Sequence, residues 1–284
     1  MVDGSQIHVL VATQLTCLVQ FRDNLSKDPQ LRLSFVASLN DAGEVLADPQ
    51  KRTDVLVVDN ALDGTFDLIK EVRQTYPRLL IILVDQQVDF GMPGYADEVS
   101  VTPFEDDDLL KRIKRLTEER SLDTLRADAL PPVRAFAKSL RRAGPGASKS
   151  QAAVEAIKEL GYDYVAFYTI VPTAPPELKL GAQMGADALT TIAPQQQDIY
   201  NSLAGWVAQN GQSRVVGPED QPNHPFIRQQ RFQSGVCVPV GTTLRFGVIL
   251  ACREQPDAIT QQNVLVLELV SAQLANALAR QTRS

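Results

Sequence analysis

Short apolar runs alternate with helix-like segments over the first 120 residues of the chain. The four clearest runs are rich in β-branched residues and lie at 7–11, 31–36, 54–59 and 79–84. Residues 99–101 are a weaker fifth candidate. Helix-like segments separate the runs at 16–26, 41–46 and 66–75. Near-continuous apolar strands that alternate with helices predict an α/β domain with a doubly wound parallel sheet of five strands.

The carboxyl ends of these strands are where ligands of such folds bind. Asp59 closes the third apolar run, and Thr102-Pro103-Phe104-Glu105 opens a helix after the fifth. With these two motifs and the order and spacing of its elements, the segment 6–120 resembles the receiver domain of bacterial response regulators. The resemblance implies a flavodoxin-like strand order and places Asp59 at the position of the phosphorylated aspartate.

Four positions around Asp59 depart from the receiver pattern. The resemblance places a magnesium-binding acidic pair at Ala12 and Thr13, a switch Ser or Thr at Asp85, and a Lys at Thr102. Phosphoryl transfer needs cations, the metal and the Lys together, to neutralise the phosphoryl oxygens. The sequence offers neither the metal ligands nor the Lys, and Asp85 adds a like charge. We therefore predict a pseudo-receiver in which Asp59 is either a leftover carboxylate or a locally hydrogen-bonded one at the strand end.

The segment between the fourth and fifth strands also departs from the family. Residues 86–96 are few and contain Gly91, Pro93 and Gly94. We predict that no full helix with its two connections fits there. Receivers use that helix for switching and dimerisation, so this surface is expected to be remodelled.

A helix is predicted to join the two halves of the chain. It begins in the acidic run 105–108, and Leu109, Ile113 and Leu116 form its apolar stripe. The basic residues on its other faces are typical of a solvated surface, and Pro131-Pro132 interrupts the pattern. The predicted division is a receiver-like domain (1–120), a helical connector (121–132) and a second domain (133–284).

The second domain shows a different pattern. Its expected helices lie at 133–142, 151–160, 199–209 and 263–280. Its expected strands lie at 164–171, 177–184, 212–216, 236–240 and 246–252. Helices before and after a hairpin-rich antiparallel sheet predict an α+β domain.

Three segments of the second domain resemble the GAF domain, a ligand-sensing and dimerising module of many signalling proteins. They are SLAGWVAQNG at 202–211, SGVCVPV at 234–240 followed by FGVI at 246–249, and the closing helix at 264–279. The resemblance covers 122–281 and implies a small-molecule pocket without naming the ligand. We find no complete cyclic-nucleotide signature, and no Cys is followed by His as in many bilin-binding relatives.

Aromatic and basic residues are the candidates for this GAF pocket. The candidates are Trp206, Phe226, Phe232, Arg228 and Arg231. The aromatic side chains would either line an apolar pocket or pack the core. The arginines would either bind an anionic ligand at the mouth or form a polar rim. For His224 the choice is between a solvated or capping loop residue, which we favour, and a haem ligand.

Cys237 and Cys252 fall within predicted strands and are expected to be small buried hydrophobes. If the hairpin pairs Val240 with Phe246, Cys237 faces Ile249, and the two thiols are not direct cross-strand partners. This register weakens a third interpretation, a GAF-fold enzyme that reduces free methionine sulfoxide through cysteine chemistry.

The closing helix carries apolar residues around much of its circumference. Leu267, Val270, Leu274 and Leu278 form one stripe, and further apolar residues widen it. We expect one side to pack on the sheet and the other to meet a second copy, as GAF domains commonly dimerise. The alternative is that residues 133–140 cover it within one chain.

Composition narrows the class of protein. The chain of 284 residues has 28 Lys+Arg against 34 Asp+Glu, a net charge of −6, which argues against nucleic-acid or anionic-lipid binding. No apolar run approaches the ~20 residues that span a bilayer, and residues 1–15 lack signal-peptide features, so we expect no membrane association and a cytoplasmic location. The three scattered Cys predict neither a disulfide framework nor a metal site.

These patterns predict a non-enzymatic signalling protein in which a pseudo-receiver and a dimerising GAF module act through other signalling proteins. A small-molecule GAF ligand would gate it if the pocket is open, and no cofactor is identified. One alternative is a response regulator controlled by phosphorylation of Asp59. Another is a redox enzyme that uses Cys237 or Cys252, and in a third the pocket is filled by side chains and the GAF half is a scaffold.

Overall fold

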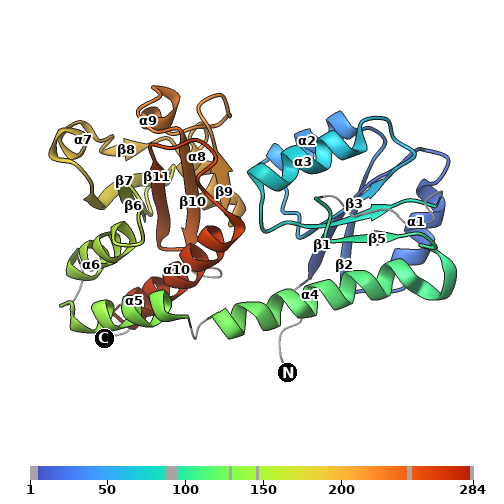
Figure 1. The fold of residues 1–284 in the computed structure, drawn as a ribbon, viewed down its shortest axis with the longest axis horizontal. Helices are drawn as coiled ribbons and strands as arrows, with labels where there is room; N and C mark the ends of the chain where they lie inside the picture. The colour runs from blue at the N-terminus through green and yellow to red at the C-terminus, as the bar shows by residue number, and fades with distance from the viewer. Residues whose placement is uncertain (1–5, 87–94, 128–129, 145–146, 242–244, 282–284) are drawn as a thin grey trace. The chain divides into compact units, whose positions relative to one another are not determined.

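The computed structural model describes residues 6–86, 95–127, 130–144, 147–241 and 245–281. The chain divides into two compact units, Met1–Asp123 and Thr124–Ser284 (Figure 1). The predicted connector, residues 121–132, contains the last turns of helix α4 (Asp108–Ala127) and the start of α5 (Pro131–Arg142). Pro131 and Pro132 begin a helix, which is favourable because the first helical N–H groups have no partner within the helix.

The first unit contains an all-parallel five-stranded sheet in the order β2-β1-β3-β4-β5. Its strands are β1 (Ile7–Ala12), β2 (Leu31–Val36), β3 (Val55–Asp59), β4 (Leu80–Val84) and β5 (Glu98–Ser100). Every residue of β3 and β4 is buried, as expected for strands covered on both faces. The predicted fold class and flavodoxin-like strand order are confirmed.

Helices cover both faces of this parallel sheet (Figure 1). They are α1 (Leu18–Leu25), α2 (Leu39–Ala47), α3 (Thr65–Thr75) and α4, which follows a short 3-10 turn (Glu105–Asp107). The predicted stripe Leu109, Ile113 and Leu116 of α4 is buried in the same core as Phe21 of α1. Residues 87–94 lie outside the described part of the chain, so the expected absence of a helix at 86–96 stays a prediction.

The second unit contains a six-stranded antiparallel sheet in the order β8-β7-β6-β11-β10-β9. Its strands are β6 (Tyr164–Val171), β7 (Glu177–Met184), β8 (Gln196–Gln197), β9 (Arg214–Val216), β10 (Ser234–Val240) and β11 (Gly247–Arg253). Its helices are α5, α6 (Ala147–Lys158), α7 (Asp187–Ile192), α8 (Leu203–Asn210), α9 (Pro225–Arg228) and α10 (Gln261–Gln281). The predicted α+β architecture is confirmed.

Helices α5, α6 and α10 pack together on one face of the antiparallel sheet. Leu267, Val270 and Leu274 of α10 are fully buried, and Val133 and Phe136 of α5 share their core. Helix α5 thus covers α10 within one chain, which is the alternative to a second copy. The apolar width of α10 therefore gives no argument for a dimer, and dimerisation stays a prediction.

The β10–β11 hairpin corrects the predicted register by one residue. Val240 lies opposite Gly247, because Phe246 belongs to the loop and donates its N–H to the Val240 carbonyl oxygen (2.9 Å). Cys237 faces Leu250 instead of Ile249. Because side chains alternate between the two faces of a sheet, a shift of one residue in the register changes which residues of β11 share a face with Cys237. Cys252 therefore lies on the same face as Cys237, as its diagonal neighbour.

Candidate functional sites

The carboxyl edge of the parallel sheet brings together the positions that the sequence singled out. Asp59 is the last residue of β3, and Ala12 is the last of β1. Thr13 directly follows β1, Asp85 directly follows β4, and Thr102 lies two residues beyond β5. Because all five strands are parallel, these strand ends share one edge of the sheet.

Both carboxylate oxygens of Asp59 accept hydrogen bonds from the protein itself. The Thr13 hydroxyl donates to Oδ2 (2.7 Å), and the Ala61 N–H donates to Oδ1 (3.0 Å). The residue is only 9% exposed. Of the Lys and Arg side chains in the described ranges, none lies within ion-pair distance of Asp59. The carboxylate is therefore held by neutral donors.

The structure also describes the other positions that the sequence singled out around Asp59, namely Ala12, Asp85 and Thr102. Ala12 is fully buried and offers only a methyl group. The buried Asp85 accepts a hydrogen bond from the Asn60 amide (2.7 Å), so it contacts the neighbour of Asp59. The Thr102 side chain is exposed. Where the structure describes the chain, no three His, Cys, Asp or Glu side chains gather into a metal-binding group.

On the antiparallel sheet, the face away from α5, α6 and α10 is packed with aromatic side chains. Tyr164 of β6 contacts Phe226 of α9 edge to face (5.2 Å between ring centroids) and stacks on Phe232 (6.0 Å). These three rings and Trp206 of α8 are at most 2% exposed. The predicted pocket aromatics Trp206, Phe226 and Phe232 are thus buried, and Tyr164 contacts two of them, Phe226 and Phe232.

His224 is enclosed within the same face. Its Nδ1 accepts the Phe226 N–H (3.2 Å) and so caps α9, which confirms the capping interpretation. The prediction of a solvated residue is wrong, because His224 is only 1% exposed. Its Nε2 lies 3.1 Å from the Tyr168 hydroxyl, which also lies 3.2 Å from the Pro194 carbonyl oxygen. Because Nδ1 accepts, the neutral ring carries its proton on Nε2 and donates it to Tyr168, which donates onward to Pro194. Burial lowers the pKa of His224 to about 3, so the ring is neutral at physiological pH.

The two predicted arginines lie outside this packed face, and another arginine lies within it. Arg228 and Arg231 are exposed, and the Arg231 guanidinium lies 5.9 Å from the centroid of the Phe226 ring. Arg214 of β9 is only 5% exposed, lies 5.1 Å from the Trp206 ring centroid, and donates to the Gln221 carbonyl oxygen (2.7 Å). Sequence reasoning missed Arg214 because an arginine in a short strand gives no signal of burial.

Cys237 and Cys252 are both fully buried free thiols on this face. Burial raises the pKa of Cys237, and burial together with the nearby Cys237 and Asp163 raises the pKa of Cys252. Since the thiolate is the nucleophile, neither side chain is prepared for redox chemistry at neutral pH.

Comparison with known proteins identifies the class of the second unit. Residues 150–278 match the family model of the GAF domain, and this part of the chain is a GAF domain. The match does not extend into the first unit. A search of curated proteins found no match.

The solved structures to which this chain is similar are distant from it in sequence. A free methionine-R-sulfoxide reductase from Neisseria meningitidis is 19% identical, with 52% of this chain and 86% of that chain covered and a TM-score of 0.46. The GAF domain of a phosphoenolpyruvate-protein phosphotransferase from Acinetobacter is 18% identical, with 57% of this chain and 95% of that chain covered and a TM-score of 0.42.

In the described part of the chain, no helix has both the length and the apolar character that crossing a membrane requires.

Proposed function

We propose that this protein is a non-enzymatic signalling protein. In this proposal a degenerate receiver-like domain and a GAF domain act through contacts with partner proteins. The GAF domain supports a role as a sensor or signalling module. Signalling of this kind needs only a difference in affinity between two states, without a chemical step.

The hydrogen bonding of Asp59 is the observation that carries the proposal. A phosphoryl acceptor needs a metal ion and a cation beside its carboxylate to neutralise the phosphoryl oxygens. Here the Thr13 hydroxyl and the Ala61 N–H, both neutral, each donate one hydrogen bond to the carboxylate. Ala12 and Thr13 supply no carboxylate for the metal, and Thr102 supplies no cation. Asp59 therefore acts as a structural acceptor that ties the ends of β1 and β3 together.

The packing of the GAF domain supports the alternative in which side chains fill the pocket and the GAF domain serves as a scaffold. Tyr164, Phe226 and Phe232 are in mutual contact and buried, so a ligand at the position of these rings would have to displace them. The burial of Cys237 and Cys252 argues against the cysteine-based reductase. Self-association through the GAF helices remains part of the proposal on the family resemblance alone.

Treatment with acetyl phosphate and Mg²⁺ tests the proposal. We expect the intact mass of the wild-type protein to stay unchanged, with a genuine receiver domain in the same mixture as the positive control. A phosphate adduct that is present in the wild type and absent from Asp59→Asn would overturn the proposal in favour of the phosphorylation-controlled regulator. Native mass spectrometry of the same sample gives the subunit count, and a monomer at micromolar concentration would remove dimerisation from the proposal.

A further inference from the structure

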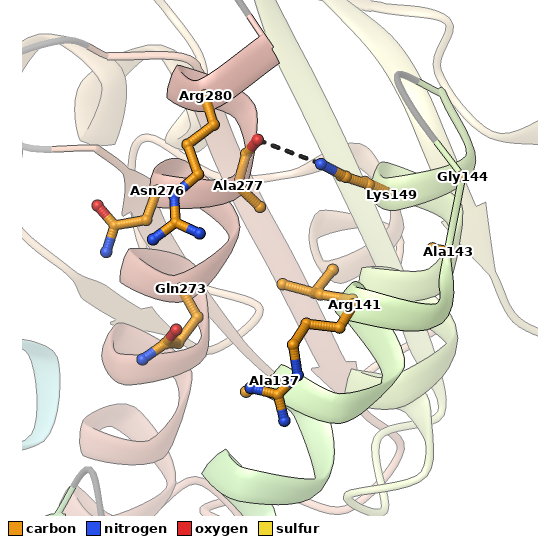
Figure 2. A pocket seen from close by; sticks show the side chains of 10 residues that line it. Ala137, Arg141, Ala143, Gly144, Lys149, Gln273, Asn276, Ala277 and Arg280 are labelled. Atoms are coloured by element: carbon orange, nitrogen blue, oxygen red, sulfur yellow. Dashed lines mark hydrogen bonds between the residues drawn. The ribbon is translucent and has the colours of Figure 1, made fainter.

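A groove lies among the three helices on the opposite face of the GAF sheet from the packed aromatic cluster. It has a volume of about 610 Å³ and is formed by α5, the start of α6 and the C-terminal half of α10. Figure 2 shows Arg141 from α5 on one side and Gln273, Asn276 and Arg280 from α10 on the other. This volume falls within the range of about 300–1,000 Å³ that is typical of small-molecule sites.

The groove is lined by cations and by amides, with no carboxylate among its lining residues. Arg141, Lys149 and Arg280 supply three positive charges, and Gln273 and Asn276 supply amide donors. Ala137 and Leu140 add apolar surface. The local charge is thus opposite in sign to that of the whole chain, which is −6.

Helix α5 strengthens this local positive charge. It carries four cations and no acidic residue, and the cations are Arg134, Lys138, Arg141 and Arg142. Over the residues that the structure describes, none of the four has a carboxylate within 4.0 Å. Arg141 is exposed at the groove, so its guanidinium is available to a ligand.

Cations near helix C-termini also offset the negative end of the helix dipole. Lys149 serves that role in part, because its amine donates to the Ala277 carbonyl oxygen at 3.4 Å. Arg141 has no such hydrogen bond to a carbonyl oxygen in the described ranges, so capping does not account for it. In addition, Lys149 lies in the first turn of α6, which brings the positive end of that helix to the groove.

We propose that this groove binds a small anion that carries two or more phosphate groups. Arginine matches phosphate oxygens with paired N–H donors, and three cations that line one groove complement a polyphosphate better than a single phosphate. The partly exposed Ala137 and Ala277 give the groove an apolar surface for an organic part, as in a nucleoside triphosphate. The concave shape and limited volume favour a small molecule over a nucleic acid. This inference does not rest on the proposed role of Asp59, but its groove is formed by the GAF helices through which self-association is proposed.

Calorimetric titration of the full chain with four probes tests the inference. The probes are ATP, inorganic tripolyphosphate, AMP and adenosine, at an ionic strength of about 0.15 M. We expect ATP and tripolyphosphate to bind, AMP to bind much more weakly, and adenosine not to bind. If only ATP binds, the organic part is required, whereas equal binding of ATP and tripolyphosphate shows that the phosphates suffice. If neither polyphosphate binds, the inference is wrong.

Single substitutions on α5 and α10 distinguish a specific binding site in the groove from non-specific electrostatic attraction to the cations. Arg141→Gln should weaken ATP binding by about tenfold or more, because it removes a charge-assisted hydrogen bond. Arg134→Gln is the matched control, since it removes the same charge two turns earlier on the same face of α5. Gln273→Glu, which adds a carboxylate to the groove without removing a cation, should weaken binding as strongly as Arg141→Gln. Equal weakening by Arg134→Gln and Arg141→Gln, or tighter binding of a short DNA duplex than of ATP, would refute the inference.

Discussion

The enclosed ring of His224 should make the stability of the GAF domain depend on pH between 8 and 5. Burial holds the pKa of this ring at about 3 in the folded state, whereas an unfolded histidine titrates near its ordinary value of 6.5. The unfolded state therefore binds a proton first as the pH falls. The stabilisation is fully present above pH 6.5 and is lost progressively below it.

The size of the loss follows from the difference between the two pKa values. A pH of 5 lies about 1.5 units below the pKa of the unfolded histidine, which is then mostly protonated, while the buried ring is still neutral. At ~1.4 kcal/mol per unit, the free energy of unfolding falls by about 2 kcal/mol between pH 8 and pH 5. Asp198, whose pKa is lowered mainly by the Tyr200 N–H, titrates below this window in both states and adds little.

Trp206 provides a selective assay of this effect. It is the only tryptophan of the chain and lies buried in α8, so its fluorescence reports on unfolding of the GAF domain. Urea titrations at pH 8 and pH 5 give the two free energies of unfolding. His224→Asn is the control, because asparagine caps a helix well and does not titrate.

The control decides whether His224 is the cause. The difference between pH 8 and pH 5 should shrink by about 2 kcal/mol in His224→Asn relative to the wild type. If both proteins lose the same free energy on acidification, or if the wild type loses none, the ring is not held neutral by burial and the reasoning fails.

Two further predictions concern Asp59 and the thiols. Thr13→Ala removes the hydroxyl that donates to Asp59 and should lower the stability of the first unit by about 1–3 kcal/mol, while Thr13→Ser keeps the donor and most of the stability. Thermal unfolding followed by circular dichroism measures this difference, and equal melting of the two variants would contradict it. Iodoacetamide should label the partly exposed Cys17 in the native protein and leave Cys237 and Cys252 unmodified until unfolding, because burial raises the pKa of both. Peptide mass spectrometry reads the labels, and rapid native labelling of either buried thiol would favour the reductase alternative.

The fold was predictable where a local pattern encodes an element. The run LLIILV became the fully buried strand β4, and the stripe of Leu109 and Ile113 became the buried side of α4. Strand β8 was not predictable, because its two glutamines, Gln196 and Gln197, join the sheet only through pairing with β7. The hairpin register was missed by one residue, since apolar residues continue through Phe246 into the loop.

The candidate sites were predictable in position but not in detail. Parallel topology placed Thr13 and Asp59 at one edge, yet only the structure shows that the hydroxyl of one donates to the carboxylate of the other. The contact between Tyr168 and His224 spans 56 positions of sequence, and no local pattern reports it. From the sequence, Tyr164 and Tyr168 could be predicted only to lie in a strand, and not to contact the aromatic side chains or His224.

Beryllofluoride, which mimics a phosphoryl group, tests the role of Asp59 most directly because it needs no phosphate donor and does not hydrolyse away. Crystals of the protein soaked with beryllofluoride and MgCl₂ would show the state of this carboxylate. We predict an unmodified Asp59 that still accepts the hydrogen bonds from Thr13 and Ala61. An adduct on the Asp59 oxygen with a magnesium ion beside it would contradict the assignment of a receiver-like domain that signals without phosphorylation.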